Sequence, residues 1–387
     1  MARMKVRCLS IHADYRCRHS GACCTSGWAI PVERGLLPRL TSAIDAGRLV
    51  VPSAPSGTPS PFLVPDHAPA EVAAVLRTDA AGTCSFYRRG DGLCAIQHAL
   101  GHGSLPASCQ HFPRVCLLEP DVVWVTLSHY CPTAVDLLFR TDVELSVVEA
   151  PSTLNGNEIE VEGLDARETF PPLVRPGLLA DREIYHAWER FFIEALGEDA
   201  TPERALARVS QVTERLRRWQ PGPTALPEAL DSAIADVGDP IADQPAASPP
   251  ARPPSQAVIN SYRLVCSAIP DKTMGDGPSF DLEKALTENV DPSWPAFSRA
   301  IANYVASKAF ANWSAYQGHG LRTVVRSVEV ALDVLRLEAA RQCASAGRPL
   351  DADLLRNAFR AADLLLLHLV SPEQLADRLR IIENERT

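Results

Sequence analysis

The crowding of cysteine into its first third is the feature that most constrains this chain. Nine of the eleven cysteines lie within the first 131 of 387 residues, and two of them are adjacent. Cysteine packs like a small hydrophobe, so packing alone gives no reason to gather thiols in this way. The crowding therefore indicates a metal centre or a disulfide scaffold. The nine residues are Cys8, Cys17, Cys23, Cys24, Cys84, Cys94, Cys109, Cys116 and Cys131.

The expected cellular compartment favours the metal centre. The basic N-terminal residues are followed by no apolar segment of the kind found in secretory signals. No stretch reaches the roughly 18 consecutive apolar residues of a membrane span, so we expect no membrane contact and a cytoplasmic location. Cytoplasmic thiols stay reduced, and clustered ones there bind metals or catalyse reactions. An odd number of cysteines also fits a complete disulfide framework poorly.

The charge distribution excludes one class of partner. The net charge is -9, but residues 1–140 hold 13 basic and 10 acidic side chains. A mild positive balance suits a site rich in negatively charged thiolates. It is far too weak for nucleic-acid binding, which needs a concentrated basic face, so no nucleic-acid partner is expected.

Length and residue patterning predict a mainly α fold with a small irregular or β cysteine-rich metal-binding N-terminal part and an α-helical bundle in the C-terminal half. β-branched runs at residues 122–127, 143–148 and 158–161 are expected to form strands. Thr201 and Ser371 each precede a Pro-Glu pair and are expected to cap helices. The predicted domains are residues 1–140 as a cysteine-cluster metal-binding domain, 141–220 as short strands and then helices, 221–255 as a Pro-rich linker or disordered insertion, and 256–387 as the C-terminal bundle.

Two further expectations concern the second half of the chain. Residues 221–254 hold nine prolines and few large apolar side chains, so no helix is expected there. The segment at residues 354–367 is apolar almost all round, which predicts a central position in the bundle.

Local patterns place some of the cysteines relative to one another. The segment CRHSGACC at residues 17–24 is a tight turn region. Side chains alternate along an extended backbone, so Cys23 and Cys24 are expected to face opposite sides. A Gly-Asp-Gly turn is expected to form a hairpin that brings Cys84 and Cys94 together.

The spacing excludes several familiar sites. There is no Cys-x2-Cys zinc-finger pair, no four-cysteine ferredoxin run and no cysteine loop of radical S-adenosylmethionine enzymes. The sequence also lacks the Gly-rich cofactor loop of ordinary methyltransferases, a zinc-protease helix, a nucleophile elbow and a phosphate-binding loop. No catalytic residue is assigned on these grounds.

Four short motifs nevertheless occur together. Gly-Trp follows the double cysteine, CAIQ begins at Cys94, Phe-Pro-Arg follows Cys109, and Thr-Leu-Ser leads into Cys131-Pro132. In combination they resemble the YkgJ-type cysteine-cluster proteins, described as zinc- or iron-chelating. Within that group the chain looks most like the flagellin lysine-N-methylase (FliB-type) branch. The specific resemblance covers roughly residues 14–140.

The resemblance implies a metal centre, a [4Fe–4S] cluster or zinc, and in the FliB-type branch the transfer of methyl groups from S-adenosylmethionine to flagellin-like lysines. The alternative is a structural or chelating zinc site in a partner-binding protein without catalysis. Ser20 stands where the YkgJ pattern usually has a further cysteine, which leaves seven thiols. The metal ligands implied are Cys17, Cys23, Cys24, Cys84, Cys94, Cys109 and Cys131.

Other side chains near these cysteines have less specific expectations. His19, His111 and His129 each lie close in sequence to a motif cysteine. They are expected to act as metal ligands or as residues that support the ligands. Arg114 is expected to bind a carboxylate, to neutralise thiolates or to form a structural salt bridge, and Trp28 to pack near the site. Cys116, Cys266 and Cys343 are expected to be core thiols, and Cys8 is left open.

Overall fold

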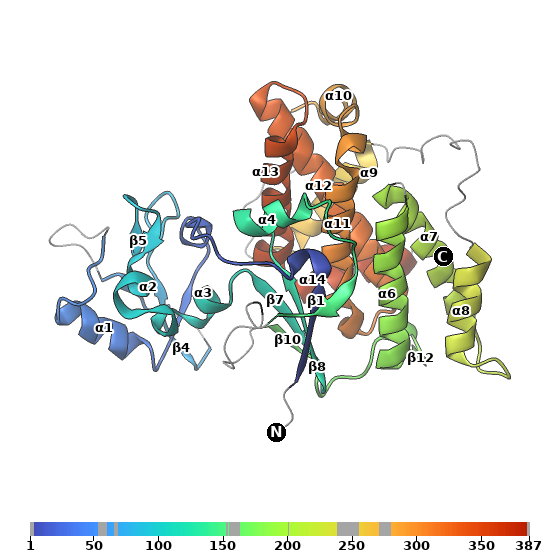
Figure 1. Ribbon diagram of the computed structural model, residues 1–387, viewed down its shortest axis with the longest axis horizontal. Helices are drawn as coiled ribbons and strands as arrows, with labels where there is room; N and C mark the ends of the chain where they lie inside the picture. The colour runs from blue at the N-terminus through green and yellow to red at the C-terminus, as the bar shows by residue number, and fades with distance from the viewer. Residues whose placement is uncertain are drawn as a thin grey trace.

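The computed structural model describes residues 4–52, 60–65, 69–151, 154, 163–199, 201–237, 255–270 and 280–384. Helices account for 54% of the structure and strands for 13%, so the prediction of a mainly α protein is confirmed. Figure 1 shows a small lobe built from the N-terminal part at the left, a sheet beside it, and helices at the centre and right.

A five-stranded sheet joins the lobe to the helices, with strand order β10-β7-β8-β1-β9. β1 runs parallel to β8, and β7 runs antiparallel to β8. The strand predicted at 122–127 is confirmed, whereas the one predicted at 143–148 is shorter and residues 158–161 lie outside the described residues. The strands are β1 (Lys5–Leu9), β7 (Arg114–Leu118), β8 (Val122–Leu127), β9 (Val147–Glu149) and β10 (Gly163–Asp165).

The two faces of this sheet are buried in different cores, as the alternation of side chains along a strand requires. Leu9 and Leu117 pack into the large core of the helices. Cys8 and Cys116 both pair with Val125 on neighbouring strands and lie in a separate core, 0% and 1% exposed. The packing role expected for Cys116 is therefore supported, and Cys8 has the same role.

The N-terminal lobe (residues 13–112) is an excursion of the chain between β1 and β7. A three-stranded sheet, a hairpin and short helices surround a small core that includes Val32, Leu40, Phe86 and Ile96. Its elements are η2 (Ala22–Cys24), β2 (Pro31–Glu33), α1 (Leu37–Asp45), β3 (Phe62–Leu63), β4 (Val72–Leu76), β5 (Tyr87–Arg88), β6 (Leu93–Cys94), α2 (Ala95–Leu100), η3 (His102–Ser104) and α3 (Ala107–His111).

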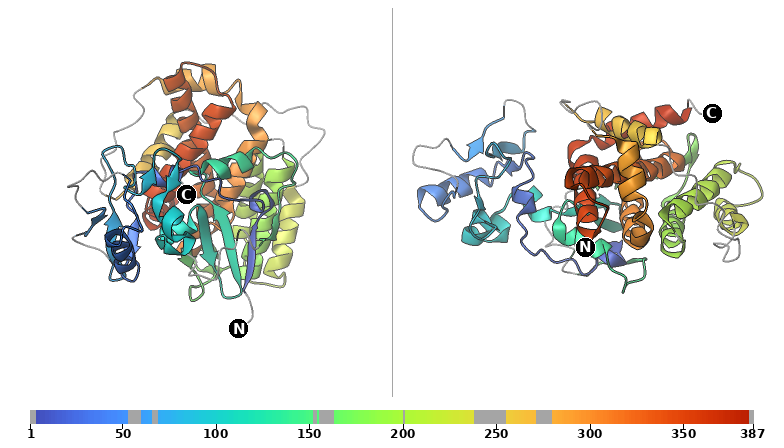
Figure 2. Two further views of the ribbon diagram at one scale, coloured as in Figure 1. Left: turned by 60° about the vertical axis from the view of Figure 1, so that its left-hand side comes forward. Right: turned by 90° about the horizontal axis from the view of Figure 1, so that it is seen from above.

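The helical part is arranged around α12, which contacts α7, α9, α11, α13 and α14. Seen from above, α6, α7 and α8 lie on the side of the bundle away from the lobe (Figure 2). The helices are α4 (Pro132–Leu138), α6 (Arg182–Glu198), α7 (Pro202–Arg217), α8 (Leu226–Val237), α9 (Ser255–Ser267), α10 (Leu282–Ala285), α11 (Ser298–Ala309), α12 (Leu321–Ala346), α13 (Ala352–Asp363) and α14 (Pro372–Asn384). Shorter elements are η1 (Ser10–His12), η4 (Leu286–Val290), η5 (Trp294–Phe297), η6 (Trp313–Gln317), η7 (Leu364–Leu369) and the hairpin of β11 (Leu173–Arg175) and β12 (Leu178–Leu179).

Two helix predictions are confirmed at their N-termini. The side chain of Thr201 accepts a hydrogen bond from the amide of Arg204, and Ser371 Oγ accepts one from the amide of Gln374. Side-chain oxygens at this position satisfy amides that have no partner within the helix. Among the described helices, none is both long enough and apolar enough to cross a bilayer.

Two predictions for the second half are wrong. A helix, α8, forms within the Pro-rich segment, because Pro227 is its second residue, where no intrahelical partner for an amide is lost. Leu230 and Ala233 are buried, and α8 packs on α6 and α7. The segment at residues 354–367 is not the central helix either, because that position belongs to α12, which contacts five other helices. The apolar run at Leu364–Leu369 forms a π-helix whose last residue is exposed. Residues 238–254 lie outside the described residues.

Candidate metal centre

The topology of the five-stranded sheet brings distant segments of the chain to one edge. The end of β1, the end of β8 and the start of β7 meet there, because β1 and β8 are parallel and β7 is antiparallel to β8. Tyr15 and Cys17 follow β1, Cys131 follows β8, and Arg114 begins β7. The hydroxyl oxygen of Tyr15 lies 3.8 Å from Cys131 Sγ. The sheet therefore supplies one side of the candidate site.

The N-terminal lobe supplies the other side. Cys23 and Cys24 lie in η2, a single 3₁₀ turn that follows Gly21 at a φ of 71°. The thiol of Cys24 lies close enough to those of Cys23 and Cys94 to shift their pKa values. The prediction that Cys23 and Cys24 face opposite sides is wrong, because it assumed an extended backbone, whereas the 3₁₀ turn points both thiols into one cavity.

A hairpin carries the third member of this thiol group. β5 pairs with β6 so that Tyr87 lies opposite Cys94, and Gly92 in the turn has a φ of 72°. The predicted hairpin is thus confirmed. Cys84 precedes it, and its amide donates a 2.8 Å hydrogen bond to the carbonyl oxygen of Cys24. This bond fixes the hairpin against the turn that carries the double cysteine.

A cavity of about 320 Å³ lies between the lobe and the sheet edge. Six of the seven cysteines expected as ligands line it. The seventh, Cys84, is buried and lies close enough to Cys94 and Cys23 for their charges to raise its pKa. The lining cysteines are Cys17, Cys23, Cys24, Cys94, Cys109 and Cys131.

The central thiols differ in acidity because they share protons. Hydrogen bonding from Cys24 lowers the pKa of Cys94 to about 7, despite burial, with help from the amides of Gln97 and Ile96. The same donor lowers the pKa of Cys23. The pKa of Cys24 is raised, because its own proton is held by these two neighbours. Cys24 is therefore the least acidic of these three thiols.

Burial controls the other thiols. It raises the pKa of Cys84 to about 11 and the pKa of Cys109 well above its ordinary value, and the negative charges of neighbouring thiolates act in the same direction. Burial also raises the pKa of Cys131. Buried thiols of this kind ionise when a metal cation provides the compensating charge.

The ionisable side chains on the cavity wall, other than cysteine and tyrosine, are basic. Among the described residues that line the cavity, they are Arg16, His19, His102 and Arg114, and none is acidic. Cys17 is exposed, and its sulfur accepts a 3.4 Å hydrogen bond from the amide of His19. His19 Nδ1 lies 4.0 Å from the same sulfur. His19 is thus close to the thiols.

The two other histidines considered as ligands do not line the cavity. His129 is fully buried, with Nδ1 3.1 Å from Asp363 Oδ2 and Nε2 3.3 Å from His12 Nε2. Both of its ring nitrogens are therefore engaged by other side chains. His111 lies at the end of α3.

Trp28 and Arg114 have defined positions beside the cavity. Trp28 lies half-buried among the rings of Phe112, Tyr130 and His368, which agrees with its expected packing role. Gly27, the residue before Trp28, packs against Gly82. A Cβ atom added to Gly82 would come within 2.8 Å of the Cα atom of Gly27, so the two backbones lie very close together. The Arg114 guanidinium donates to main-chain carbonyls and, within the described part of the chain, forms no salt bridge.

No three His, Cys, Asp or Glu side chains among the described residues form a preformed metal-binding group. The chain matches no protein-family model, no curated protein and no solved structure. Membership of the YkgJ-type group therefore remains a prediction, and the chemistry of the site depends on its own residues.

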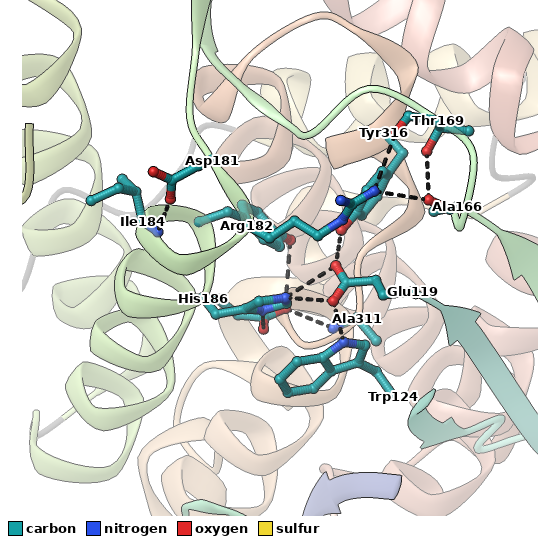
Figure 3. A network of polar contacts seen from close by, with 12 residues as sticks. Glu119, Trp124, Ala166, Thr169, Asp181, Arg182, Ile184, His186, Ala311 and Tyr316 are labelled. Atoms are coloured by element: carbon teal, nitrogen blue, oxygen red, sulfur yellow. Dashed lines mark hydrogen bonds and ion pairs between the residues drawn. The ribbon is translucent and has the colours of Figure 1, made fainter. Parts of the chain in front are cut away.

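The sequence patterns did not predict a buried polar network between α6 and the turn that joins β7 to β8 (Figure 3). His186 Nε2 lies 2.9 Å from Glu119 Oε2, and its Nδ1 lies 3.1 Å from Glu189 Oε2. Tyr316 and Trp124 also donate to Glu119. Burial disfavours the imidazolium, but the hydrogen bonds that it donates to both carboxylates, and their charges, raise the pKa of His186 to about 9. The spacing of His186 and Glu189 on one helix was the available signal.

A second buried network ties the sheet edge to the bundle. Asp363 Oδ1 lies 2.6 Å from Lys308 Nζ and accepts a 2.8 Å hydrogen bond from the Tyr304 hydroxyl. Asp363 Oδ2 accepts a 2.6 Å hydrogen bond from the amide of His129. A single carboxylate thus joins α13, α11 and the segment after β8. Its charge near the start of the apolar run at residues 361–370 was the signal in the sequence.

Proposed function

We propose that this protein holds a thiolate-bound metal centre between its N-terminal lobe and its central sheet. The observation that carries the proposal is the gathering of six cysteines around one cavity, with Cys24 close enough to Cys23 and Cys94 to shift the pKa of each. Cys109 and Cys84 lie within electrostatic reach of this group. These five cysteines are the primary ligand candidates.

The donor set fits such a centre. Soft thiolate sulfurs select zinc and iron–sulfur clusters, and either takes four cysteine ligands in its all-thiolate form. The amides of Ile96 and Gln97 near Cys94 favour its thiolate, and hydrogen bonds to sulfur tune such centres. Arg16 and Arg114 on the cavity wall offset the negative charge that four thiolates bring.

The position of the cavity gives the centre a structural consequence. Cys131 lies shortly after β8 at the sheet edge, whereas Cys17 and the five primary candidates belong to the lobe. A metal that takes Cys131 together with lobe cysteines as ligands fixes the lobe against the edge of the sheet. When bound, an iron–sulfur cluster supplies one-electron chemistry, and zinc supplies a redox-inert crosslink.

The charges on the cavity wall do not favour methyl transfer to lysine, although the aromatic residues Tyr15 and Phe112 line it. A lysine ammonium or a sulfonium cofactor is a cation, and such ligands are recognised by carboxylates or aromatic faces. The described residues on the wall include four basic side chains and no carboxylate. The methylase activity implied by the resemblance therefore remains a prediction, and the proposal concerns the metal.

Anaerobic purification with iron, sulfide and zinc analysis tests the proposal. We expect about one metal centre per chain. A brown protein with a broad thiolate-to-iron absorption band identifies an iron–sulfur cluster, and a colourless protein with stoichiometric zinc identifies a zinc site. Protein without either metal, after reconstitution with iron and sulfide or with zinc, contradicts the proposal.

Single substitutions locate the ligands. Cys94→Ser and Cys109→Ser are expected to lose most of the bound metal, because each removes a thiol from the cavity. Cys343→Ser is the control, since Cys343 is a buried cysteine of α12 in the helical core and does not line the cavity. Equal metal content in all three variants would place the metal elsewhere.

A further inference from the structure

A second cavity, of about 350 Å³, lies between the five-stranded sheet and the helices. Its size falls in the range of about 300–1,000 Å³ that small-molecule sites occupy. Val115 lines it from the sheet, and Trp313, Leu366 and Leu375 line it from three separate helical elements. The indole N–H of Trp313 donates a 3.1 Å hydrogen bond to the carbonyl oxygen of Cys116, which fixes the ring in the wall.

The polar side chains of this wall already donate their hydrogen bonds within the protein. The amide nitrogen of Asn312 donates to a main-chain carbonyl oxygen at 2.8 Å and to Ser327 Oγ at 3.0 Å, and Asn312 Oδ1 accepts from the hydroxyl of Ser314 at 2.5 Å. The hydroxyls of Ser327, Ser307 and Thr126 each donate to a main-chain carbonyl oxygen, at 2.7, 2.6 and 3.4 Å. None of these donors is left for a ligand.

The charged side chains at this wall are compensated or face away from it. Among the described residues that line the cavity, Lys308 and Arg114 are the ionisable ones. Lys308 Nζ lies 2.6 Å from Asp363 Oδ1, which neutralises it. Side chains alternate along β7, so Val115 faces the helices together with Leu117, and Arg114 faces the opposite side. The Arg114 guanidinium donates to three main-chain carbonyl oxygens on that side. The cavity is therefore apolar and without net charge.

Two irregular stretches of backbone contribute to the wall. Ala311 has a φ of 53°, in the left-handed region that residues other than glycine rarely adopt, and its amide donates a 2.8 Å hydrogen bond to the buried carboxylate of Glu189. The π-helix η7 contributes Leu366 and Leu367. Both kinds of irregularity cost free energy and are found frequently at functional sites. Their occurrence around one cavity favours a binding role over a defect in packing.

We propose that this second cavity binds one neutral small molecule that consists mostly of hydrocarbon. A buried charge without a partner is unfavourable, and the wall offers no free partner for one, so charged ligands are rejected. An apolar cavity of about 150 Å³ holds one benzene ring, so a cavity of about 350 Å³ accommodates a molecule of roughly two rings. The proposal does not depend on the metal centre, because no cysteine is among the described residues that line this cavity.

Equilibrium dialysis of the full-length protein against naphthalene tests this proposal, with 2-naphthoate as the matched charged probe. We expect naphthalene to bind once per chain and 2-naphthoate to bind at least about tenfold more weakly, because its carboxylate would be buried without a partner. Equal or tighter binding of 2-naphthoate, or no retention of naphthalene by the folded protein, overturns the proposal.

Filling the cavity locates the probe. Ala376→Phe on α14 and Val115→Phe on β7 each add volume to the wall, and both are expected to abolish naphthalene binding. Gln374→Phe is the matched control, because it adds the same ring to an exposed position of α14 that does not line the cavity, and it is expected to leave the binding unchanged. Circular dichroism confirms that each variant is folded, and filling sites on two different elements keep the test valid if one variant unfolds. Unchanged naphthalene affinity in a folded filling variant overturns the proposal.

Discussion

The indole of Trp28 stacks on the imidazole of His368, with ring centroids 4.4 Å apart and planes 30° apart. Trp28 belongs to the N-terminal lobe and His368 to the π-helix η7 near the end of the chain. Burial lowers the pKa of His368 to about 4, so its ring stacks in the neutral form at neutral pH. His368 Nε2 also lies 2.7 Å from Ser128 Oγ, directly after β8. This stack joins the lobe, the sheet edge and the bundle.

Trp28→Ala is expected to loosen the lobe from the rest of the molecule. Truncation of a fully buried aromatic costs about 3–5 kcal/mol, and we expect about 2 kcal/mol here because Trp28 is half-buried. Limited proteolysis is expected to cut the lobe before the helices. Trp219→Ala, which removes a half-buried tryptophan after α7, is the control and leaves the lobe protected. Equal cleavage patterns in the two variants contradict this role.

The His186 network predicts a pH-dependent stability. The pKa of His186 rises from 6.5 to about 9 on folding, so its contribution is fully present below pH 6.5 and is lost as the pH rises through about 9. That difference corresponds to about 3 kcal/mol. His186→Gln is expected to be less stable than the unaltered protein at pH 6.5, and the gap is expected to narrow toward about pH 10.

Urea unfolding across this pH range measures the effect. His98→Gln, which changes an exposed histidine in the lobe, is the control and is expected to follow the unaltered protein. A constant gap between His186→Gln and the unaltered protein at all pH values would falsify the assignment of His186 as a protonated bridge.

Asp363→Asn is expected to destabilise the protein by about 3–5 kcal/mol, because it leaves the buried ammonium of Lys308 without its counter-charge. Asp353→Asn on the same helix is the matched control. Asp353 pairs with Arg356 at 3.2 Å on the surface, and exposed pairs contribute only about 0–1 kcal/mol. Urea unfolding of the two variants is the measurement. Similar losses in both would mean that Lys308 finds another partner.

Local sequence patterns predicted those parts of the site that depend on neighbouring residues. The Gly-Asp-Gly turn correctly predicted the hairpin that carries Cys94. Thr201 and Ser371 correctly predicted the N-termini of two helices. The approach of Tyr15 to Cys131 depends on the parallel pairing of β1 with β8, which more than 100 residues separate. No local pattern determines such a pairing, because it is decided by which faces the whole sheet buries.

The wrong predictions have equally specific causes. Alternation placed Cys23 and Cys24 on opposite sides, but the backbone after Gly21 forms a 3₁₀ turn. Proline content argued against a helix at residues 226–237, although a proline in the first turn is compatible with one. In both cases the position of one residue within the turn or helix mattered more than the composition of the segment.

Ser20→Cys tests the ligand shortage at the candidate metal centre. Ser20 lines the cysteine cavity, three residues after Cys17, and stands where the YkgJ pattern usually has a cysteine. A thiol at this position adds a donor to the cavity wall, so the metal should be held more firmly. We expect metal release to a chelator to slow on the order of tenfold, as changes around a metal site typically alter affinity by that amount.

Ser26→Cys is the matched control for this experiment. Ser26 lies two residues after Cys24, but its Oγ donates to the carbonyl oxygen of Cys23 and it does not line the cavity. A cysteine there adds the same thiol to the same segment without adding a donor to the cavity, so the release rate is expected to stay at the value of the unaltered protein. If Ser20→Cys and Ser26→Cys release metal at the same rate, the cavity is not where the metal is held, since only the first substitution changes its donor set.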